Sequence, residues 1–484
     1  MKNDLDQKST PLLHALITHQ GLERISAHVP GHKNGRGLSS AFARYAGLAA
    51  RLDATELPGL DDLHHPAGVI EQAQQLAAQA FGSDETYFLV AGSTGGNLAS
   101  ILAVVDPFDV VLVGRNAHQS VWNALELAHA QKVAVTPQWD QYGIVGGLSP
   151  DAVQHAIALF KGAKALVVTS PTYDGLISDL PRIVQLAHEA DMIVIVDEAH
   201  GVHLPFHHDL PVSGIAAGAD IVVHSAHKMG TGFTQTGLLH VQGPRVDRQR
   251  LQRMLRMVQS SSPSYLLMAS LDAMRSQLAC CGEQLLDCSL QDLHVQKRRL
   301  QEIGKDIVLD YGSTSLQDPF KWIVQADALQ MSGWELERAL REGYGIYSEY
   351  AAAHHVLLAW SYANSAREME KAADALLALG KDLPDAVPHK SREPNFTARL
   401  ISDLMPPLTR KERDQGTDLP LQEAVGYRAA DSVTVYPPGI PLLLPGERFR
   451  QEHIEILTPV LDNGNRVDGV TKDGCYKVRC LPLQ

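Results

Sequence analysis

The residues with the clearest chemical use in this sequence are a carboxylate and a lysine, each of which follows a run of apolar residues. Asp197 follows the run 194–196 and opens the motif Asp-Glu-Ala-His, and Lys228 ends the motif Ser-Ala-His-Lys. A lysine amine can bond to an aldehyde, and a carboxylate facing a pyridine nitrogen keeps that nitrogen protonated, so the ring can take up electrons from a breaking bond. Together the two residues predict a site for pyridoxal 5′-phosphate (PLP).

Either residue alone would be weak evidence, because a lone lysine after a strand is usually a solvated surface group. Asp-Glu-Ala-His at 197–200 is also a helicase signature. A helicase would need an upstream loop of the type Gly-x-x-x-x-Gly-Lys-Ser/Thr, and the sequence contains none. The sequence therefore favours the cofactor interpretation.

A third segment could hold the cofactor phosphate. Residues 88–97 read Phe-Leu-Val-Ala-Gly-Ser-Thr-Gly-Gly-Asn, an apolar run that leads into a Gly/Ser/Thr turn and then into a helix pattern. Backbone N–H groups at a helix start, together with the helix dipole, attract an anion. Most turns of this kind only begin helices, so the argument depends on the accompanying carboxylate and lysine.

The same region predicts an α/β fold with a mainly parallel sheet. Between about residues 66 and 245, short β-branched apolar runs alternate with amphipathic helical stretches, and runs apolar on both faces imply a sheet covered on both sides. In such sheets ligands gather at the carboxyl ends of the strands, where Asp197 and Lys228 fall. The expected strands are Thr86–Val90, Val110–Val113, Val133–Thr136, Ala165–Thr169, Ile193–Val196, Ile221–His224 and Leu238–Val241.

Patterning divides the chain into an N-terminal arm (1–65), a PLP-binding large domain (66–303), a small α/β domain (304–386) and a C-terminal domain (387–484). The segment Val387–Glu412 is rich in proline and charge and is typical of a linker. The helices expected outside the large sheet are Pro11–His19, Leu266–Ile303, Trp334–Glu342 and Ala366–Leu379. The strands expected in the small domain are Lys321–Val324 and Val356–Ser361.

Composition narrows the class of protein. The net charge of −13 over 484 residues argues against a nucleic-acid or anionic-membrane partner and agrees with a cationic substrate. The sequence shows no apolar run of membrane-spanning length and no apolar signal core at its start, so we expect a cytoplasmic protein. Five cysteines without zinc-ligand spacing predict neither a disulfide framework nor a metal site.

Eight motifs, in order and spanning nearly the whole chain, resemble those of a known family. They are His28–Gly35 (HVPGHKNG), Glu56–Pro66 (ELPGLDDLHHP), Gly92–Asn97 (GSTGGN), Arg115–Ser120 (RNAHQS), Ser170–Gly175 (SPTYDG), Asp197–His200 (DEAH), Ser225–Lys228 (SAHK) and Tyr436–Glu447 (YPPGIPLLLPGE). The sequence is similar to the small form of the Orn/Lys/Arg decarboxylase family. These are PLP enzymes of the aspartate-aminotransferase-like fold, known as fold type I.

The resemblance implies a role for each matching residue. Lys228 would bond to the cofactor aldehyde, Asp197 would pair with the ring nitrogen, and His118 would stack on the ring face. Lys228 or His227 would return a proton to Cα, and the residues leave that choice open. The remaining cofactor contacts implied are Ser93, Thr94 and Gly95 at the phosphate, Ser225 and His227 as further donors, Ala199 beneath the ring, and His200, whose contact stays open.

The resemblance also implies decarboxylation of a basic amino acid. Arginine, which would give agmatine, comes first, followed by lysine and ornithine. A cationic side chain needs carboxylates in the pocket, and the candidates are Glu56, Asp61, Asp62, Glu349 and Glu447. Two departures from the family pattern bear on substrate choice: Ala352 stands where the family carries Asp, and the run 229–233 is unusually rich in glycine.

Other classes of protein remain as alternatives. Transamination or aldol cleavage in the same fold would use the same lysine and carboxylate, and Arg479 would then be the candidate for gripping the substrate α-carboxylate. A non-catalytic binding protein would be expected to lose Lys228 or Asp197, and both are present. The resemblance further implies a homodimer, or a higher homo-oligomer, with active sites at the subunit interface. The segments Glu56–Pro66 and Tyr436–Glu447 would complete the neighbour's pocket.

Overall fold

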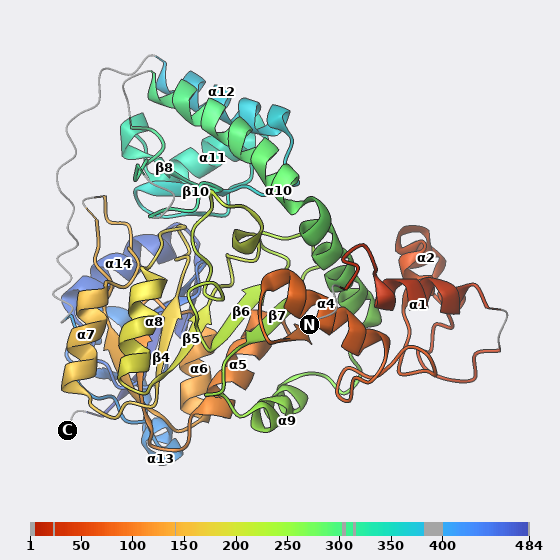
Figure 1. The fold of residues 1–484 in the computed structure, drawn as a ribbon. Helices are drawn as coiled ribbons and strands as arrows, with labels where there is room; N and C mark the ends of the chain where they lie inside the picture. Colours follow the sequence, from red (N-terminus) through yellow and green to blue (C-terminus); the bar gives the residue numbers. More distant parts are fainter. Residues whose placement is uncertain are drawn as a thin grey trace. The chain divides into compact units, whose positions relative to one another are not determined.

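The computed structural model describes residues 5–22, 25–140, 142–302, 306–312, 316–381 and 400–482. The chain separates into two compact units, which are coloured along the sequence in Figure 1. Unit 1 comprises Met1–Val104 and Ile193–Cys288, and unit 2 comprises Val105–Met192 and Ser289–Gln484. The four-domain division expected from the sequence stays a prediction.

All seven strands expected in the large domain are present, in the order β1-β7-β6-β5-β4-β2-β3. The β2–β3, β2–β4 and β5–β6 pairs are parallel, whereas β7 pairs antiparallel with both β1 and β6. The predicted α/β fold class with a mainly parallel seven-stranded sheet is therefore confirmed. The apolar runs in the sequence located these strands because parallel strands are buried on both faces.

Unit 1 carries the four strands β1 (Glu85–Leu89), β5 (Ile193–Asp197), β6 (Ile221–Ser225) and β7 (Gly237–Val241). Helix α5 (Gly92–Val104) packs on all four. The contact is close because Gly96 has no side chain, and a Cβ there would lie 2.6 Å from Val223 Cγ1. Helix α9 (Arg248–Val258) packs on the outside of α5.

The other face of these strands meets α4 (Val69–Phe81), whose Phe81 ring contacts the rings of His224 and His240. Helix α1 (Pro11–Gln20) packs on α4, and the short helices α2 (Ser40–Ala46) and α3 (Ala49–Leu52) follow it in the arm. Side chains on a strand alternate between faces, so Val223 meets α5 while His224 points towards α4. The two faces of β6 therefore have different surroundings.

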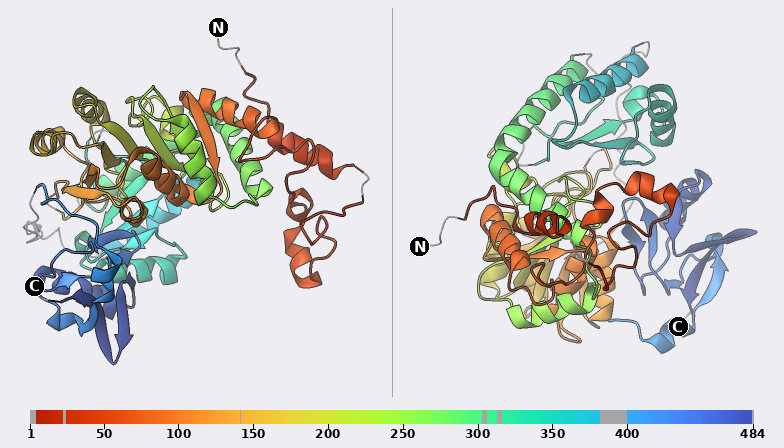
Figure 2. Two further views of the ribbon diagram at one scale, coloured as in Figure 1. Left: turned by 90° about the horizontal axis from the view of Figure 1, so that it is seen from below. Right: turned by 90° about the vertical axis from the view of Figure 1, so that its right-hand side faces the viewer.

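Unit 2 begins with strands β2 (Val110–Gly114), β3 (Gln131–Val135) and β4 (Ala165–Thr169) and helices α6 (Gln119–Leu127), α7 (Pro150–Leu159) and α8 (Leu180–Glu189). Both views in Figure 2 show α10 (Tyr265–Gln301) as one continuous green helix. The predicted helix ended at Ile303, which lies outside the described residues.

The expected small-domain elements are also present in unit 2. Strands β8 (Lys321–Gln325), β10 (His355–Ala359) and β9 (Tyr350–Ala351) form a sheet on which α11 (Gly333–Tyr344) packs, and α12 (Ala366–Gly380) follows. Both helices begin with a capping box in which a serine and a glutamate satisfy each other's backbone N–H groups.

The segment expected to be a linker, 387–412, differs from that expectation in its described part. The backbones of Lys132 and Met405 exchange two hydrogen bonds of 2.9 and 2.8 Å, and the Thr136 N–H donates to the Leu400 carbonyl at 2.8 Å. Residues 400–405 therefore add an antiparallel partner to β3. Residues 382–399 lie outside the described part of the chain, so the rest of the linker prediction is not addressed.

The C-terminal part of unit 2 holds two small sheets. One contains β11 (Thr417–Pro420), β12 (Arg428–Ala429), β16 (Val470–Asp473) and β17 (Cys475–Leu481), and the other contains β13 (Val433–Tyr436), β14 (Ile440–Leu443) and β15 (Arg466–Asp468). Helices α13 (Arg410–Asp414) and α14 (Gln451–Asp462) complete this region. Arg479 lies on β17, opposite Asp418. Among the described residues, no helix is both long and apolar enough to span a bilayer.

Candidate active site

Asp197 ends β5 with its side chain buried. Its Oδ2 atom accepts a hydrogen bond from Asn97 Nδ2 on α5 at 3.0 Å, and its Oδ1 atom accepts one from the Ala199 N–H at 3.3 Å. Donors on both oxygens hold the carboxylate in one orientation. The sequence analysis placed Asn97 only in the turn motif and missed its contact with Asp197.

Lys228 follows β6, the strand parallel to β5, and its Nζ atom lies 3.2 Å from His200 Nε2. His200 is buried, whereas Lys228 is exposed. The two motifs meet because the carboxyl ends of neighbouring parallel strands lie at the same edge of the sheet. His227 lies beside the lysine, and its Nδ1 atom is 3.0 Å from the Thr236 carbonyl. Since a carbonyl only accepts, Nδ1 carries the proton and Nε2 is the basic nitrogen.

The start of α5 lies beside β6. Ser225 Oγ donates to Ser93 Oγ at 2.7 Å, which joins the two predicted phosphate contacts. Thr94 is exposed, but the Gly95 N–H already donates to the Ala91 carbonyl at 3.1 Å. Ser93, Thr94 and Ser225 therefore remain the proposed phosphate donors. Gly95 allows close packing, because a Cβ there would lie 2.9 Å from Ala91 Cβ.

These groups fit PLP in its three chemical parts. An accessible lysine amine suits the aldehyde, a buried carboxylate supported by Asn97 suits the protonated ring nitrogen, and a helix start with three hydroxyls suits the phosphate. All of them belong to unit 1. The fit to PLP is argued from the chemistry of these side chains: the amine, the carboxylate and the hydroxyls.

A buried polar chain runs behind these residues on the α4 side of the sheet. His224 Nε2 lies 2.7 Å from Glu198 Oε2, and His224 Nδ1 lies 3.1 Å from His240 Nε2. His240 Nδ1 in turn is 2.8 Å from Thr86 Oγ1. Burial, and then the neighbouring His224, hold the pKa of His240 well below its usual value. A neutral His240 accepts from Thr86 and donates to His224, which donates to Glu198. The chain thereby ties Glu198, next to Asp197, to three other strands.

His118 belongs to unit 2, where it caps the start of α6 by accepting the Ser120 N–H at 3.1 Å. The late motif 436–447 packs against it, since a Cβ on Gly439 would lie 2.9 Å from His118 Nε2. The Gln119 N–H also donates to the Gly439 carbonyl at 2.9 Å. Two motifs far apart in the sequence therefore meet in unit 2, and ring stacking by His118 stays a proposal.

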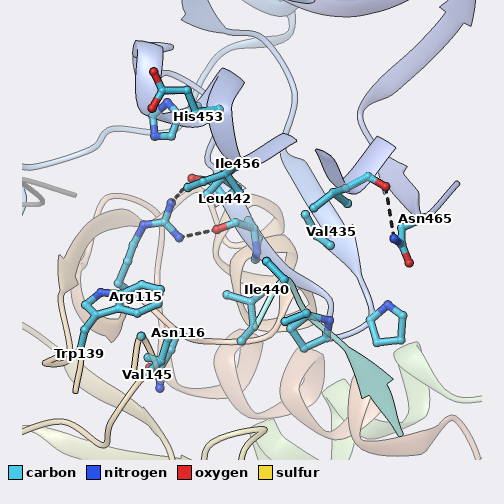
Figure 3. Close-up of a pocket in the computed structure, with 18 of the residues that line it drawn as sticks. Arg115, Asn116, Trp139, Val145, Val435, Ile440, Leu442, His453, Ile456 and Asn465 are labelled. Carbon is cyan, nitrogen blue, oxygen red and sulfur yellow. Dashed lines mark hydrogen bonds between the residues drawn. The ribbon is translucent and has the colours of Figure 1, made fainter. Parts of the chain in front are cut away.

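Arg115 secures the same late segment (Figure 3). Its guanidinium donates to the Pro441 carbonyl at 2.6 Å, to the Leu442 carbonyl at 2.9 Å and to Glu447 Oε2 at 3.0 Å. Glu447 also accepts the Leu444 N–H at 2.8 Å. Its Oε2 atom serves the internal structure of unit 2, and a substrate contact by Glu447 stays a proposal.

Arg115 also lines a cavity of about 1780 Å³ in unit 2, together with Trp139, Glu349 and His453. Figure 3 shows His453 on the far side of this cavity from Trp139. Burial lowers the pKa of His453 to about 4, so this side chain is neutral at pH 7. Lys228 and Asp197 are not among the residues that line this cavity.

Asp61 has a different role from the one expected. Its carboxylate accepts the N–H groups of Asp62, Ala67, Gly68, Ile70 and Glu71 at 2.8–3.2 Å, at the start of α4. Partial burial opposes ionisation, but the backbone donors outweigh it and lower the pKa of Asp61. The Asp61 carboxylate caps helix α4, so we assign this residue a structural role. Asp62 accepts the His64 N–H at 2.8 Å, and Glu56 contacts Thr55.

Glu349 is the predicted carboxylate with the most suitable surroundings for a cationic group. Its Oε1 atom accepts from the Tyr173 hydroxyl at 2.6 Å. Burial, and then the Glu349 charge, raise the pKa of Tyr173, so the phenol stays protonated. Asp174 accepts from Tyr350, whose hydroxyl lies 2.7 Å from His355 Nε2. Tyr173 lies in the motif 170–175, but its contact with Glu349, 176 residues away, could not be predicted from local pattern.

Comparison with known proteins places this arrangement in a family. Residues 10–328 match the family model described as Orn/Lys/Arg decarboxylase, major domain, and residues 407–473 match the C-terminal domain of the same family. The chain belongs to the Orn/Lys/Arg decarboxylase family. The resemblance seen in the eight motifs is confirmed, and with it the prediction of a decarboxylase.

Two curated relatives align with this chain over almost their whole length. An arginine decarboxylase of Bacillus subtilis (strain 168) is 36% identical over 99% of both chains. An arginine decarboxylase of Halalkalibacterium halodurans is 36% identical over 98% of both. Lysine decarboxylase LdcA of Pseudomonas aeruginosa is more distant, at 26% identity over 92% of this chain and 75% of its own.

Solved structures of the family share the fold. Lysine decarboxylase A from Pseudomonas aeruginosa matches with a TM-score of 0.81 at 24% identity, covering 98% of this chain and 80% of that one. The constitutive lysine decarboxylase of Escherichia coli matches with a TM-score of 0.78 at 20% identity, covering 99% and 82%. The chain thus spans nearly the whole length of the two arginine decarboxylases from Bacillus subtilis and Halalkalibacterium halodurans, and about three quarters or more of the lysine decarboxylases named here.

Proposed function

We propose that this protein uses PLP to decarboxylate arginine, giving carbon dioxide and agmatine. The observation that carries the proposal is the placement of Lys228 and Asp197 at adjacent parallel strand ends, with Asn97 holding the carboxylate. The arginine decarboxylases that are 36% identical over nearly the whole chain support arginine over lysine and ornithine.

Bound PLP would supply an electron-accepting ring for the electron pair left at Cα when the carboxylate departs as carbon dioxide. Lys228 would hold the aldehyde carbon, and Ser93, Thr94 and Ser225 would anchor the phosphate. Asp197 would keep a proton on the ring nitrogen. Asn97 and the Ala199 N–H orient that carboxylate by donating one hydrogen bond to each of its oxygens.

A proton must reach Cα after carbon dioxide leaves. Lys228, once released by the substrate amine, is a primary amine beside His200 and can carry that proton. His227 is the alternative donor, and the Thr236 carbonyl orients its ring by accepting a hydrogen bond from Nδ1. Both residues follow β6, so either would reach the same face of the site.

The guanidinium of arginine would be held by Glu349, with Tyr173 orienting the carboxylate through its hydroxyl. A planar guanidinium binds a carboxylate through two parallel hydrogen bonds, whereas an ammonium makes a looser contact.

The working unit would be a homodimer or a higher homo-oligomer. Several large apolar side chains of the arm are exposed in the single chain, including Ile25 (96%), Tyr45 (81%) and Leu48 (71%), and a second copy would cover them. We further propose a cytoplasmic location, which the absence of any disulfide among the described cysteines supports.

Two measurements test the proposed function. The purified protein, reconstituted with PLP, is incubated separately with arginine, lysine and ornithine, and the products are identified by mass spectrometry. Agmatine from arginine supports the proposal, and a keto acid would contradict it. Borohydride reduction followed by peptide mapping should place the pyridoxyl group on Lys228, whereas a label on another lysine would overturn that assignment.

A further inference from the structure

Two adjacent histidines and a glutamate lie close together in unit 1. None of the three belongs to the proposed PLP site. His207, His208 and Glu283 each offer one ligand atom, and these atoms all lie within 4.8 Å of one another. Asp287 lies one helical turn beyond Glu283 on α10. We propose that these four residues bind a divalent transition-metal ion of the zinc type, a site that is independent of the proposed reaction.

The two histidines are held in place by packing. They follow the short helix η1 (Leu204–Phe206), whose Phe206 ring packs edge-on against Phe81 with centroids 4.9 Å apart. Helix α10 approaches this loop at Gly282, where a Cβ would come within 3.0 Å of Phe206 Cβ. A glycine at 282 therefore lets α10 pass close to the histidines, and Glu283 follows it directly. The backbone that carries the ligands therefore belongs to a packed loop and a helix.

His207 provides an observation that points to a ligand. Its side chain is only 1% exposed, and within the described part of the chain Nε2 has no hydrogen-bond partner. The nearest charged atom recorded is Asp287 Oδ1, at 3.9 Å. A buried imidazole nitrogen without a partner is unfavourable, and a metal ion placed between His207 and Asp287 would satisfy it.

Metal binding at Nε2 of His207 would change which ring nitrogen of that residue carries a proton. The Asp209 N–H donates to Nδ1 at 3.2 Å, so the neutral ring carries its proton on Nε2. Coordination through Nε2 requires that proton to leave or to move to Nδ1, and a proton on Nδ1 would displace the Asp209 hydrogen bond. One long hydrogen bond is a small loss beside a metal–imidazole bond, and the ion would be bound more tightly as the pH rises.

The surrounding charge favours a cation. His208 Nδ1 lies 2.6 Å from Glu283 Oε1, and His208 Nε2 lies 3.7 Å from Asp209 Oδ1. The carboxylates of Glu283 and Asp209 therefore lie close to the His208 ring, and their negative charge would attract a metal ion. Glu283 and Asp287 are four residues apart on α10 and so face the same side.

The ligand chemistry selects the class of ion. Two imidazoles with two carboxylates suit zinc, cobalt or nickel, whereas calcium and magnesium prefer oxygen ligands alone. Zinc bonds of about 2.1 Å in a tetrahedron bring ligand atoms to roughly 3.4 Å apart. The His207 Nε2 and Asp287 Oδ1 atoms are farther apart than this, at 3.9 Å, whereas His208 Nδ1 and Glu283 Oε1 are closer, at 2.6 Å. The side chains of His208 and Glu283 are 74% and 61% exposed, so both can move to make room for an ion. An affinity on the order of micromolar fits such a partly exposed site.

The sequence analysis expected no metal site because it considered only the cysteines. Two further patterns were visible in the sequence: the dipeptide His207-His208 and the carboxylate pair Glu283 and Asp287 at helical spacing. Nothing in the sequence joined the two, since 75 residues separate His208 from Glu283. The alternative is that His208 and Glu283 form only a surface ion pair and bind no metal. The following experiment distinguishes the two cases.

The test is a calorimetric titration of the full-length protein, loaded with PLP and stripped of metals with a chelator, with Zn²⁺. The proposal predicts one saturable ion per chain. The variants His208→Ala and Glu283→Gln should each weaken binding by at least about tenfold. These two residues are exposed, so both variants should fold, and an unchanged thermal midpoint without zinc would verify this.

Matched controls identify the ligands. His155→Ala removes an exposed histidine from α7 in unit 2 and should leave zinc binding unchanged. The triple variant Cys280→Ser, Cys281→Ser, Cys288→Ser removes the exposed thiols of α10 and should also bind normally. Saturation with Co²⁺ should give a visible absorption spectrum that is lost in His208→Ala. Turnover is not a readout, so failure here is distinct from failure of the proposed function.

Three outcomes would overturn the proposal. The first is no saturable zinc binding at concentrations up to about a millimolar. The second is that His208→Ala and Glu283→Gln both bind zinc as tightly as the wild-type protein, which would place the ion elsewhere. The third is loss of binding in the triple cysteine variant, which would assign the ion to the thiols.

Discussion

Asn97 Nδ2 lies 3.0 Å from Asp197 Oδ2, so a buried amide on α5 holds the carboxylate at the end of β5. The same helix begins at the proposed phosphate contacts, Ser93 and Thr94. One helix would therefore fix both ends of the cofactor, the phosphate and the ring nitrogen. This arrangement explains why the GSTGGN motif continues to an asparagine.

The first prediction concerns that amide. Asn97→Ala should retain PLP but lower kcat by about ten- to a hundredfold, because Asp197 loses a donor that keeps it aligned. Turnover and the cofactor absorbance are measured together. Ser100→Ala, one turn along α5, removes a buried hydroxyl that bonds only within the helix and is the matched control. A near-normal kcat in Asn97→Ala would show that the amide does not support Asp197.

A second prediction concerns the buried pair of Glu198 and His224, both side chains being fully buried. Glu198→Ala should cost about 3–5 kcal/mol of stability, since it leaves His224 Nε2 and the Gly214 N–H without their acceptor. Glu198→Gln should cost less, because an amide oxygen can still accept one of these bonds. Thermal and denaturant unfolding measure both effects. A smaller loss for Glu198→Ala than for Glu198→Gln would contradict this account.

The cap at Asp61 predicts a dependence of stability on pH. Its pKa is lower in the folded protein than the ordinary value of 3.8, so the fold stabilises the ionised group. That stabilisation is complete above pH 3.8 and is lost as the pH falls through the lowered pKa. Asp61→Asn should therefore lower the thermal midpoint at pH 7, and the difference from wild type should shrink on acidification towards pH 3.

Asp62→Asn is the control for the cap, because Asp62 accepts one backbone N–H, from His64. Its effect at pH 7 should be smaller than that of Asp61→Asn. A midpoint difference for Asp61→Asn that grows as the pH falls would contradict the role of the ionised carboxylate.

Substrate recognition gives the fourth prediction. Glu349→Gln should raise KM for arginine by about ten- to a hundredfold with PLP still bound, because a neutral amide cannot pair with a guanidinium. Tyr173→Phe should have a smaller effect in the same direction, since it removes only the orienting hydroxyl. Glu370→Gln, an exposed glutamate on α12, is the control. Unchanged KM values in Glu349→Gln would move the search to Asp174 and Asp62.

The sequence predicted the sheet well because buried parallel strands are continuous apolar runs. Every strand of the large sheet was located within two residues of its true ends. The pairing of residues 400–405 with β3 was missed, since these residues lie within the segment 387–412, whose proline and charge content resembles a linker. The bonds that join them to β3 are backbone to backbone. Local pattern carries no information about a partner that lies hundreds of residues away in the chain.

The site was predictable to the extent that its motifs are short and contiguous. Lys228, Asp197, Ser93 and Ser225 were found because each lies at a strand end or a helix start. The roles of Asp61 and Glu447 were not predictable, since an isolated carboxylate has the same sequence pattern whether it caps a helix, pairs with Arg115 or binds a substrate. The chain of Glu198, His224 and His240 was also invisible, because it runs across strands.

The central claim is tested most directly by release of labelled carbon dioxide from arginine carrying a carboxyl label. The wild-type protein with PLP should release the label as carbon dioxide, with agmatine in equal amount, and should use arginine better than lysine or ornithine. Lys228→Ala should release almost none. Label that remains in a keto acid, or equal release by wild type and Lys228→Ala, would contradict the account.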